Sequence, residues 1–279
     1  MNILEMIKIG SNFLKEKKIP SYILDSEILL SKTLKKTREE ILINLNQKIA
    51  RKDKLVFENY LCRRSKNEPI AYILEEKEFW SKNFYVTRDT LIPRPETELL
   101  VDKLLRNFNN KRITILDIGT GSGCILLSLL SQLKLSSGMG VDISKKAISI
   151  ARMNAKNHQL LHRVQLINKP FEKIHNKRFD VIVSNPPYIN TRNIKNLSED
   201  IRRYEPRMAL DGGNDGLDLI RKVIYKSKEI LKINGTLAIE IGNEQIRKVS
   251  KILINNKFRV KSTIKDYKNN IRCILANHI

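Results

Sequence analysis

A motif able to hold a planar nitrogen follows an apolar run directly, at Asn185, Pro186, Pro187 and Tyr188. The run Phe179–Ser184 is typical of a buried strand, and the Pro-Pro step must end it because proline lacks a backbone N–H and restricts φ. Carbonyls left unpaired at this turn, together with the side-chain oxygen of Asn185, are acceptors for the two hydrogens of an NH2 group. Tyr188 adds a flat face for stacking. The motif therefore predicts a site for an amide or an exocyclic amine.

A glycine-rich segment, Gly119 to Gly123, lies between a predicted strand and a predicted helix. Its alternate glycines let the backbone approach a ligand closely at a helix N-terminus. The spacing differs from the dinucleotide fingerprint Gly-x-Gly-x-x-Gly, because position 124 is Cys. In a doubly wound sheet, an acid that ends the second strand takes the two ribose hydroxyls, and Asp142 ends the run Gly138–Val141. These residues predict an adenosyl ligand.

An adenosyl ligand beside an amine site indicates S-adenosylmethionine as the cofactor and methyl transfer as the reaction, since the chain has no phosphate-binding lysine motif. The sulfonium supplies the electrophile, so the protein needs chiefly to align nitrogen, methyl carbon and sulfur. Asn185 Oδ1 and the Pro186 carbonyl would accept both amide hydrogens and so orient the nitrogen. In the alternative, Asp142 only caps the following helix, but Ser144 fits that cap better.

The elements that must position these residues form an alternating pattern beyond Pro95. Strands that alternate with helices predict a mostly parallel sheet, and therefore an α/β fold. The expected strands lie at residues 113–118, 139–142, 164–167, 179–184, 236–241, 260–263 and 272–276. The expected helices lie at residues 95–108, 124–133, 145–157, 217–231 and 245–254.

The first 75 residues have a different character, with apolar residues at helical spacing that predict a small helical bundle. Thr37 and Glu40 have the spacing of a capping box. Residues 78–86 then change to an aromatic strand pattern around a polar turn, which is typical of a β-hairpin. We therefore expect a helical substrate-recognition domain at 1–75, a hairpin linker at 76–92 and a catalytic domain at 93–279.

Composition narrows the class of protein further. The 279 residues carry a formal net charge of +22, but the lysines are scattered along the chain, so nucleic acid is not the expected substrate. Three cysteines and four histidines show neither a disulfide framework nor metal-ligand spacing, and no metal is expected. Because no signal-peptide or membrane-spanning pattern is present, the expected location is cytoplasmic, with no membrane partner.

The order of these motifs resembles that of the HemK/PrmC family of protein-(glutamine-N5) methyltransferases, which act on peptide chain release factors. The resemblance covers nearly the whole chain. It implies a Rossmann-like class I S-adenosylmethionine-dependent methyltransferase domain, with a seven-stranded, mostly parallel sheet, behind a small N-terminal helical bundle. The segments that make it specific are Pro69–Leu74, Glu78–Trp80, Leu91–Glu98, Arg203–Pro206 and Ala209–Gly213.

The resemblance also implies a role for the motif that follows residue 184. The glutamine of the release factor's Gly-Gly-Gln tip would lie against residues 185–188, and methylation there would modulate translation termination. Asn185 would touch both substrate and cofactor, and the segment 93–98 would line the entrance. The residues expected to take part in catalysis are Asn185, Pro186 and Tyr188, and those expected to bind the glutamine are Asn185, Pro186, Pro187 and Tyr188.

The cofactor residues follow from the same resemblance. After the third strand, relatives often carry an acid where this chain has Lys169, which cannot accept the amino hydrogens of adenine. Backbone groups or packing around Pro170 and Phe171 would therefore border the base. The residues expected to bind S-adenosylmethionine are Gly119, Thr120, Gly121, Ser122, Gly123, Asp142, Pro170, Phe171 and Asn185.

Three alternatives stay open at this point. An exocyclic amine of a DNA or RNA base fits the same acceptors, although the first 75 residues contain no nucleic-acid-reading motif. A glutamine of a ribosomal protein is a closer alternative, against which the helical N-terminal region and the form of residues 92–98 favour release factors. A non-catalytic nucleic-acid-binding or ribosome-binding protein conflicts with the intact glycine loop, Asp142 and Asn185.

Overall fold

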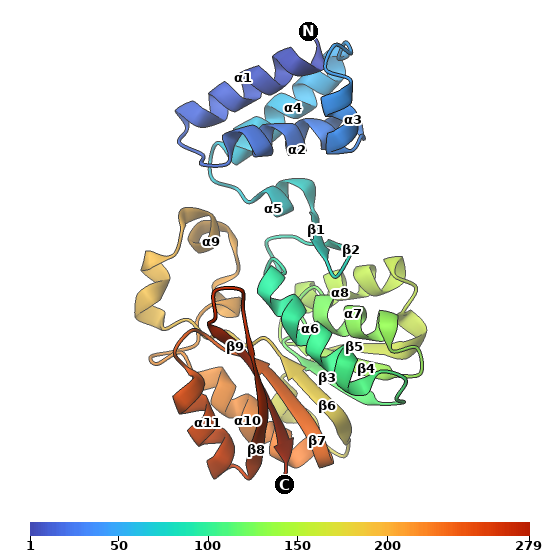
Figure 1. The fold of residues 1–279 in the computed structure, drawn as a ribbon, viewed down its shortest axis with the longest axis vertical. Helices are drawn as coiled ribbons and strands as arrows, with labels where there is room; N and C mark the ends of the chain where they lie inside the picture. Colours follow the sequence, from blue (N-terminus) through green and yellow to red (C-terminus); the bar gives the residue numbers. More distant parts are fainter. The chain divides into compact units, whose positions relative to one another are not determined.

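The computed structural model describes residues 1–279, which divide into two compact units (Figure 1). One unit comprises Met1–Glu76 and Ser198–Tyr204, and the other comprises Lys77–Leu197 and Glu205–Ile279. The units are defined by contacts within each, so the functional division expected at residues 75 and 92 stays a prediction. None of the helices combines the length and the apolar character needed to cross a membrane.

The first unit is helical, and its helices pack around one apolar core. The predicted capping box is confirmed, because the Glu40 N–H donates to Thr37 Oγ1 at 3.2 Å and the Thr37 N–H donates to the Glu40 carboxylate at 2.6 Å. Gly10 permits close packing, since a Cβ there would lie 2.7 Å from the ring of Phe57. The helices are α1 (Ile3–Glu16), α2 (Tyr22–Leu34), α3 (Arg38–Ile43), α4 (Arg51–Arg64), α5 (Ile70–Leu74) and α9 (Glu199–Tyr204).

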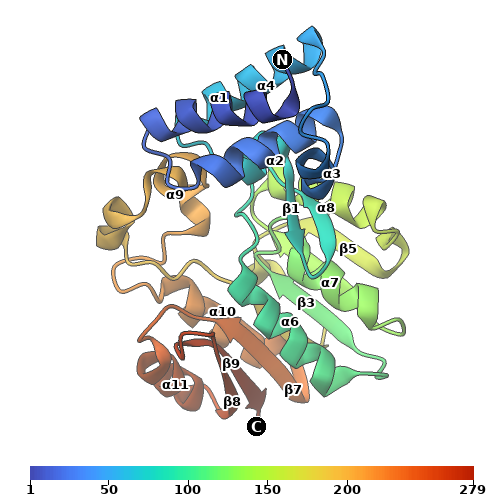
Figure 2. The same ribbon diagram turned by 45° about the horizontal axis from the view of Figure 1, so that its top comes forward.

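The second unit is a seven-stranded sheet with helices on its faces, in the order β5-β4-β3-β6-β7-β9-β8 (Figure 1, Figure 2). The strands are β3 (Thr114–Ile118), β4 (Ser137–Asp142), β5 (Val164–Asn168), β6 (Phe179–Ser184), β7 (Leu231–Glu240), β8 (Phe258–Lys265) and β9 (Ile271–His278). The helices are α6 (Pro95–Phe108), α7 (Cys124–Gln132), α8 (Lys145–Asn157), α10 (Asp218–Ile230) and α11 (Ile246–Asn255). Strands β3 to β7 are parallel, and β9 runs antiparallel to both neighbours.

The strand order creates a switch point at β3. The chain proceeds from β3 to β4 and β5 on one side, and then returns to place β6 on the other side of β3. Ile118 at the end of β3 is paired with Val141 of β4 and with Ser184 of β6. In sheets of this kind, ligands bind at the carboxyl ends of the strands on either side of such a point. The fold therefore brings the segments after residues 118, 142 and 184 to one edge.

All the predicted strands and long helices of this unit are present, but some boundaries differ. Strand β7 begins at Leu231 instead of 236, because Leu231 pairs with Phe179 across an irregularity in the register. Strands β8 and β9 extend to eight residues each, since they pair with each other along most of their length. Helices α5 and α9 are five and six residues long, and such short helices carry too few turns to show a periodic pattern.

The predicted hairpin consists of β1 (Glu76–Phe79) and β2 (Lys82–Tyr85). Its two turn residues, Trp80 and Ser81, have φ of 53° and 52°, as a tight two-residue turn with the right-handed twist requires. Because such values strain residues other than glycine, the turn needs outside support. The Trp80 N–H donates to Glu98 Oε1 at 2.9 Å and thereby fixes the turn to α6.

Asn154 joins the hairpin to the glycine-rich loop from a fully buried position in α8. Its Oδ1 accepts from the Tyr85 N–H at 2.7 Å, and its Nδ2 donates to the carbonyls of Tyr85 and Ser122, each at 2.9 Å. One amide side chain thus bonds to three backbone groups, two at the end of β2 and one in the glycine-rich loop.

We expect Asn154→Ala to lower the free energy of unfolding by about 2–4 kcal/mol, because three backbone groups, one of them fully buried and two partly buried, lose their partner. Denaturant unfolding monitored by circular dichroism measures the change. Asn157→Ala, at an exposed position of the same helix, is the matched control and should change the stability little. Equal stability of the two variants would contradict the structural role of Asn154.

Candidate active site

A pocket of about 450 Å³ lies at the carboxyl edge of β3, β4 and β6. It brings together the loop after β3, the end of β4, the segment after β5 and the motif after β6, which are far apart in the sequence. Of the predicted site residues, Gly123 and Tyr188 do not line it. The predicted residues that line it are Gly119, Thr120, Gly121, Ser122, Asp142, Pro170, Phe171, Asn185, Pro186 and Pro187.

The glycine-rich loop owes its course to backbone conformations that favour glycine. Gly119 and Gly121 have φ of 72° and 55°, and a Cβ at Gly119 would meet no protein atom within 4 Å. The N–H groups of Gly119 and Thr120 both donate to the Val141 carbonyl, at 2.9 and 3.0 Å, so the loop is tied to the neighbouring strand. At these glycines the loop therefore presents bare backbone to the open space of the pocket.

Asp142 braces this loop from the end of β4. Its Oδ2 accepts from the Gly121 N–H at 3.0 Å, and its Oδ1 accepts from the Ser144 N–H at 2.9 Å. The cap of α8 is Ser144, as predicted, since Ser144 Oγ accepts from the Ala147 N–H at 3.2 Å. Burial raises the pKa of Asp142, and the N–H donors oppose that shift.

Each carboxylate oxygen of Asp142 keeps acceptor capacity beyond the single N–H it accepts. The carboxylate lines the pocket beside the glycine-rich loop; the acid suits ribose hydroxyls, and the bare backbone at the glycines permits close approach of an adenosyl group. Pro170 and Phe171 form an apolar wall on the same pocket, next to Lys169. The residues present thus fit the predicted cofactor.

A second acid, Asp117, lies beneath the loop and does not line the pocket. Thr120 Oγ1 donates to its Oδ2 at 2.7 Å, whereas its Oδ1 has no hydrogen-bond partner. Burial, reinforced by the negative charge of Asp142, raises the pKa of Asp117 from its ordinary value of 3.8 to about 7. A neutral, buried acid therefore supports the loop over much of the acidic pH range.

The motif after β6 presents free acceptors to the pocket. Asn185 Nδ2 donates to Thr97 Oγ1 at 3.3 Å, and neither Asn185 Oδ1 nor the Pro186 carbonyl accepts a hydrogen bond from the protein. The Tyr188 carbonyl, by contrast, accepts from Gln245 Nε2 at 3.0 Å. Two acceptors at adjacent residues, both on the pocket side of the motif, suit the two hydrogens of one NH2 group.

Tyr188 lies behind these acceptors. Its hydroxyl donates to Glu240 Oε1 at 3.3 Å, and its ring packs against the apolar core under the sheet. Burial raises the pKa of this hydroxyl above its ordinary range, so it stays a donor. The ring therefore supports the motif from the side of the apolar core and does not line the pocket.

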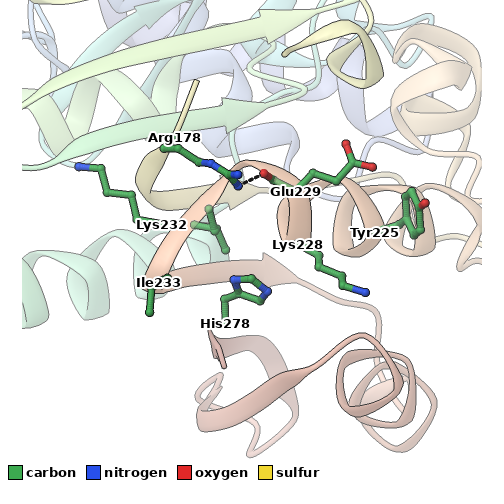
Figure 3. Close-up of a pocket in the computed structure, with 8 residues that line it drawn as sticks. Arg178, Tyr225, Lys228, Glu229, Lys232, Ile233 and His278 are labelled. Atoms are coloured by element: carbon green, nitrogen blue, oxygen red, sulfur yellow. Dashed lines mark hydrogen bonds between the residues drawn. The ribbon is translucent and has the colours of Figure 1, made fainter. Parts of the chain in front are cut away.

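A larger depression of about 920 Å³ occurs at the amino ends of β6 and β7, on the opposite edge of the sheet (Figure 3). Two of its charged side chains have partners: Arg178 donates to the backbone carbonyl of Glu229, and Lys232 pairs with Asp180 at 2.8 Å. It contains no glycine loop and none of the predicted site residues. The candidate active site is therefore the smaller pocket.

Comparisons with known proteins match both parts of the chain. A model described as the PrmC N-terminal domain matches residues 5–74, and one described as the methyltransferase small domain matches residues 95–204. The release factor glutamine methyltransferase of Clostridium acetobutylicum is 38% identical over 283 residues, covering 99% of this chain and 98% of that protein. The chain belongs to the release factor glutamine methyltransferase family. The resemblance drawn from the sequence motifs is thus confirmed.

Other members of the release factor glutamine methyltransferase family and related proteins give the same picture. The protein of that name from Caulobacter vibrioides is 35% identical, covering 94% of this chain and 92% of its own length. A bifunctional methyltransferase of Rickettsia felis is 36% identical over the whole of this chain. The chain spans 58% of the length of that relative.

Solved structures support the fold alone. A methyltransferase from Pyrococcus furiosus superimposes with a TM-score of 0.55 at 19% identity, covering 80% of this chain and 100% of that structure. A tRNA m1G37 methyltransferase from M. jannaschii gives a TM-score of 0.51 at 15% identity, covering 73% of this chain and 56% of that structure. With the observed sheet order, these likenesses confirm the predicted class I methyltransferase fold.

Residues from three of the segments by which the chain resembles this family line the pocket, namely Leu91, Pro93, Arg94, Thr97, Pro206 and Ala209. Arg94 and Glu205 form an ion pair at 2.5 Å, and Glu205 also accepts from the Ile92 N–H at 3.3 Å. Gly212 lies so close to the motif after β6 that a Cβ there would be 2.8 Å from the Pro187 carbonyl. Arg94 and Glu98 belong to the segment expected at the entrance; both hold structural contacts, and Arg94 also lines the pocket.

Two buried groups of the site, Thr97 and Glu240, were not recognised as such from the sequence. Thr97 is one residue of a family segment, and Glu240 ends the apolar run of β7. The available signal was an acid at the last position of a buried strand, where the carboxyl edge of the sheet lies. That signal becomes specific only when the strand's place next to β6 is known.

The raised pKa of Asp117 makes the stability depend on pH in a defined direction. Between pH 4 and about 7 the folded protein holds one proton more than the unfolded chain, so the free energy of unfolding falls as pH rises, by roughly 4 kcal/mol in total. We expect Asp117→Asn to lack this contribution. Urea unfolding of both proteins across this range measures it, and parallel pH profiles would contradict the assignment.

Proposed function

We propose that the protein transfers a methyl group from S-adenosylmethionine to the side-chain amide nitrogen of the glutamine in the Gly-Gly-Gln motif of peptide chain release factors. The observation that carries the proposal is one pocket in which an adenosyl-type loop and acid face the free acceptors of Asn185 and Pro186. The names of the full-length relatives support the choice of a release factor as the substrate.

The proposed cofactor residues divide by the group that they contact. The backbone of Gly119 to Ser122 would border the amino acid part, Asp142 would accept the ribose hydroxyls, and Pro170 and Phe171 would pack against the base. Gly123 supports the loop from outside the pocket. When bound, S-adenosylmethionine supplies an electrophilic methyl group on a positively charged sulfur.

The proposed task of Asn185 and Pro186 is to orient the substrate amide. An amide nitrogen is a weak nucleophile because its lone pair is delocalised into the carbonyl. Two acceptors that take both N–H hydrogens fix the plane of the NH2 group and favour localisation of the lone pair. Pro187 closes the turn, and Tyr188 keeps its backbone in place through its hydroxyl and its packing.

Residues 1–75 are proposed to recognise the body of the release factor. A protein substrate far larger than one loop needs contacts away from the reacting atom, and binding energy from such contacts also aligns the reacting groups. The helical unit exposes apolar side chains on α1, α2, α3 and α4, including Ile43 at 82% and Leu55 at 61% exposure. Exposed apolar groups of this kind are typical of protein-binding surfaces.

The direct test is transfer of labelled methyl from S-adenosylmethionine to purified release factor. We expect label on the wild-type factor and none on a factor whose tip glutamine is replaced by alanine, because only that side chain carries the NH2 group. Ribosomal proteins and bulk RNA and DNA are assayed in parallel. Label on one of those substrates, with none on the factor, would overturn the release factor assignment.

Substitutions in the amide site and in the cofactor site should affect different measured quantities. Asn185→Ala is expected to lower kcat by about 10²–10³-fold, as loss of a transition-state hydrogen bond does, with little change in cofactor affinity. Asp142→Ala should instead raise the Kd of S-adenosylmethionine by about 10–100-fold, the usual effect of losing a charged acceptor. Calorimetry and steady-state kinetics measure these effects, and near-normal turnover of Asn185→Ala would contradict the proposed amide site.

A further inference from the structure

A chain of hydrogen bonds runs behind the proposed amide site and joins its two ends. Asn185 Nδ2 donates to Thr97 Oγ1 at 3.3 Å, and Thr97 Oγ1 donates to Glu240 Oε2 at 2.6 Å. Tyr188 donates to the other oxygen of Glu240 at 3.3 Å. Thr97 and Glu240 are 2% and 0% exposed, so no water competes for these bonds. The chain connects α6, β7 and the segment after β6.

The direction of this chain follows from the number of hydrogens available. A threonine hydroxyl has one hydrogen, and Thr97 gives it to Glu240. Toward Asn185 the same oxygen can therefore only accept, and Asn185 must present its NH2 group to it. The Asn185 oxygen then points the other way, where no protein donor meets it. Which end of the Asn185 amide faces the substrate is thus decided at Glu240.

Glu240 can act in this way because a carboxylate only accepts. Thr97 and Tyr188 each donate to one of its oxygens. Burial raises the pKa of Glu240, while the Thr97 donor and the positive charge of Arg272 on the neighbouring strand β9 favour the ionised form. The two donors and the nearby cation keep the acceptor in place at the end of the chain.

We propose that Glu240 is a positioning residue that sets the direction of the hydrogen bonds through Thr97 and thereby fixes the Asn185 amide with its oxygen toward the substrate. The inference rests on the proposed function, because it concerns the acceptor that would hold the glutamine NH2 group. Glu240 itself does not line the pocket and acts only through its neighbours.

The substitution Glu240→Gln can reverse the hydrogen bond between residue 240 and Thr97. A glutamine has one acceptor oxygen and one donor NH2 group in place of two acceptor oxygens, so it cannot accept from both Thr97 and Tyr188. When its NH2 group faces Thr97, the threonine hydrogen is free to bond to Asn185 Oδ1. The Asn185 amide then turns and presents hydrogens to the substrate, where donor would meet donor.

The experiment compares labelled methylation of release factor by the full chain and its variants. Glu240→Gln and Thr97→Val are expected to lower kcat at least tenfold, with the Kd of S-adenosylmethionine close to wild type, when all variants are assayed well below their thermal midpoints. Thr97→Ser keeps the hydroxyl and should retain most of the turnover. Glu244→Gln, at an exposed position just beyond β7, is the matched control and should match wild type. Normal kcat in Thr97→Val or Glu240→Gln overturns the proposal.

A double-mutant cycle separates direction from simple support. Asn185→Asp places a carboxylate oxygen toward Thr97 and another toward the substrate. In the wild type Thr97 donates to Glu240, so it cannot also donate to this carboxylate. In Glu240→Gln the Thr97 hydrogen is released and can bond to it. The double variant is therefore expected to turn over at least tenfold faster than the product of the two single effects predicts. Multiplicative losses would overturn the directional role. Absence of methylation by the wild type itself would instead refute the proposed function.

Discussion

The pairing of β3 with β4 on one side and β6 on the other is the constraint on which the rest of the site depends. Parallel pairing places Ile118 beside Val141 and Ser184, so the three segments that follow these strands must emerge at one edge. The glycine loop, Asp142 and the Asn185 motif then need only short extensions to share a pocket of about 450 Å³. A different strand order would separate the two halves of the site, whatever their sequences.

Buried acids beneath this edge have separate tasks. Asp117 supports the glycine loop through Thr120, and Glu240 accepts from Thr97 and Tyr188 behind the amide site. Burying such groups opposes folding unless they are paired, and three of their four carboxyl oxygens accept a hydrogen bond. These buried polar groups lower the stability of the fold, but they fix the directions in which the donors and acceptors that line the pocket point.

Contacts made by residues 78–98 and by Glu205 form a frame within the second unit. Glu205 holds Arg94 and the backbone of Ile92, and Glu98 holds the strained turn at Trp80. Asn154 joins the hairpin to the glycine loop by three hydrogen bonds. Each contact joins residues far apart in the chain, so the frame restricts the motion of loops that have little regular structure of their own.

Propensity, periodicity and turn chemistry are local properties. The strands, the long helices, the caps at Thr37 and Ser144 and the two motifs could therefore be predicted from the sequence. Strand order and the partners of buried polar groups depend on contacts between distant segments, which no local pattern contains. Only the tertiary structure could therefore place Tyr188 behind the pocket, pair Thr97 with Glu240, and leave the Asn185 oxygen free to face a substrate.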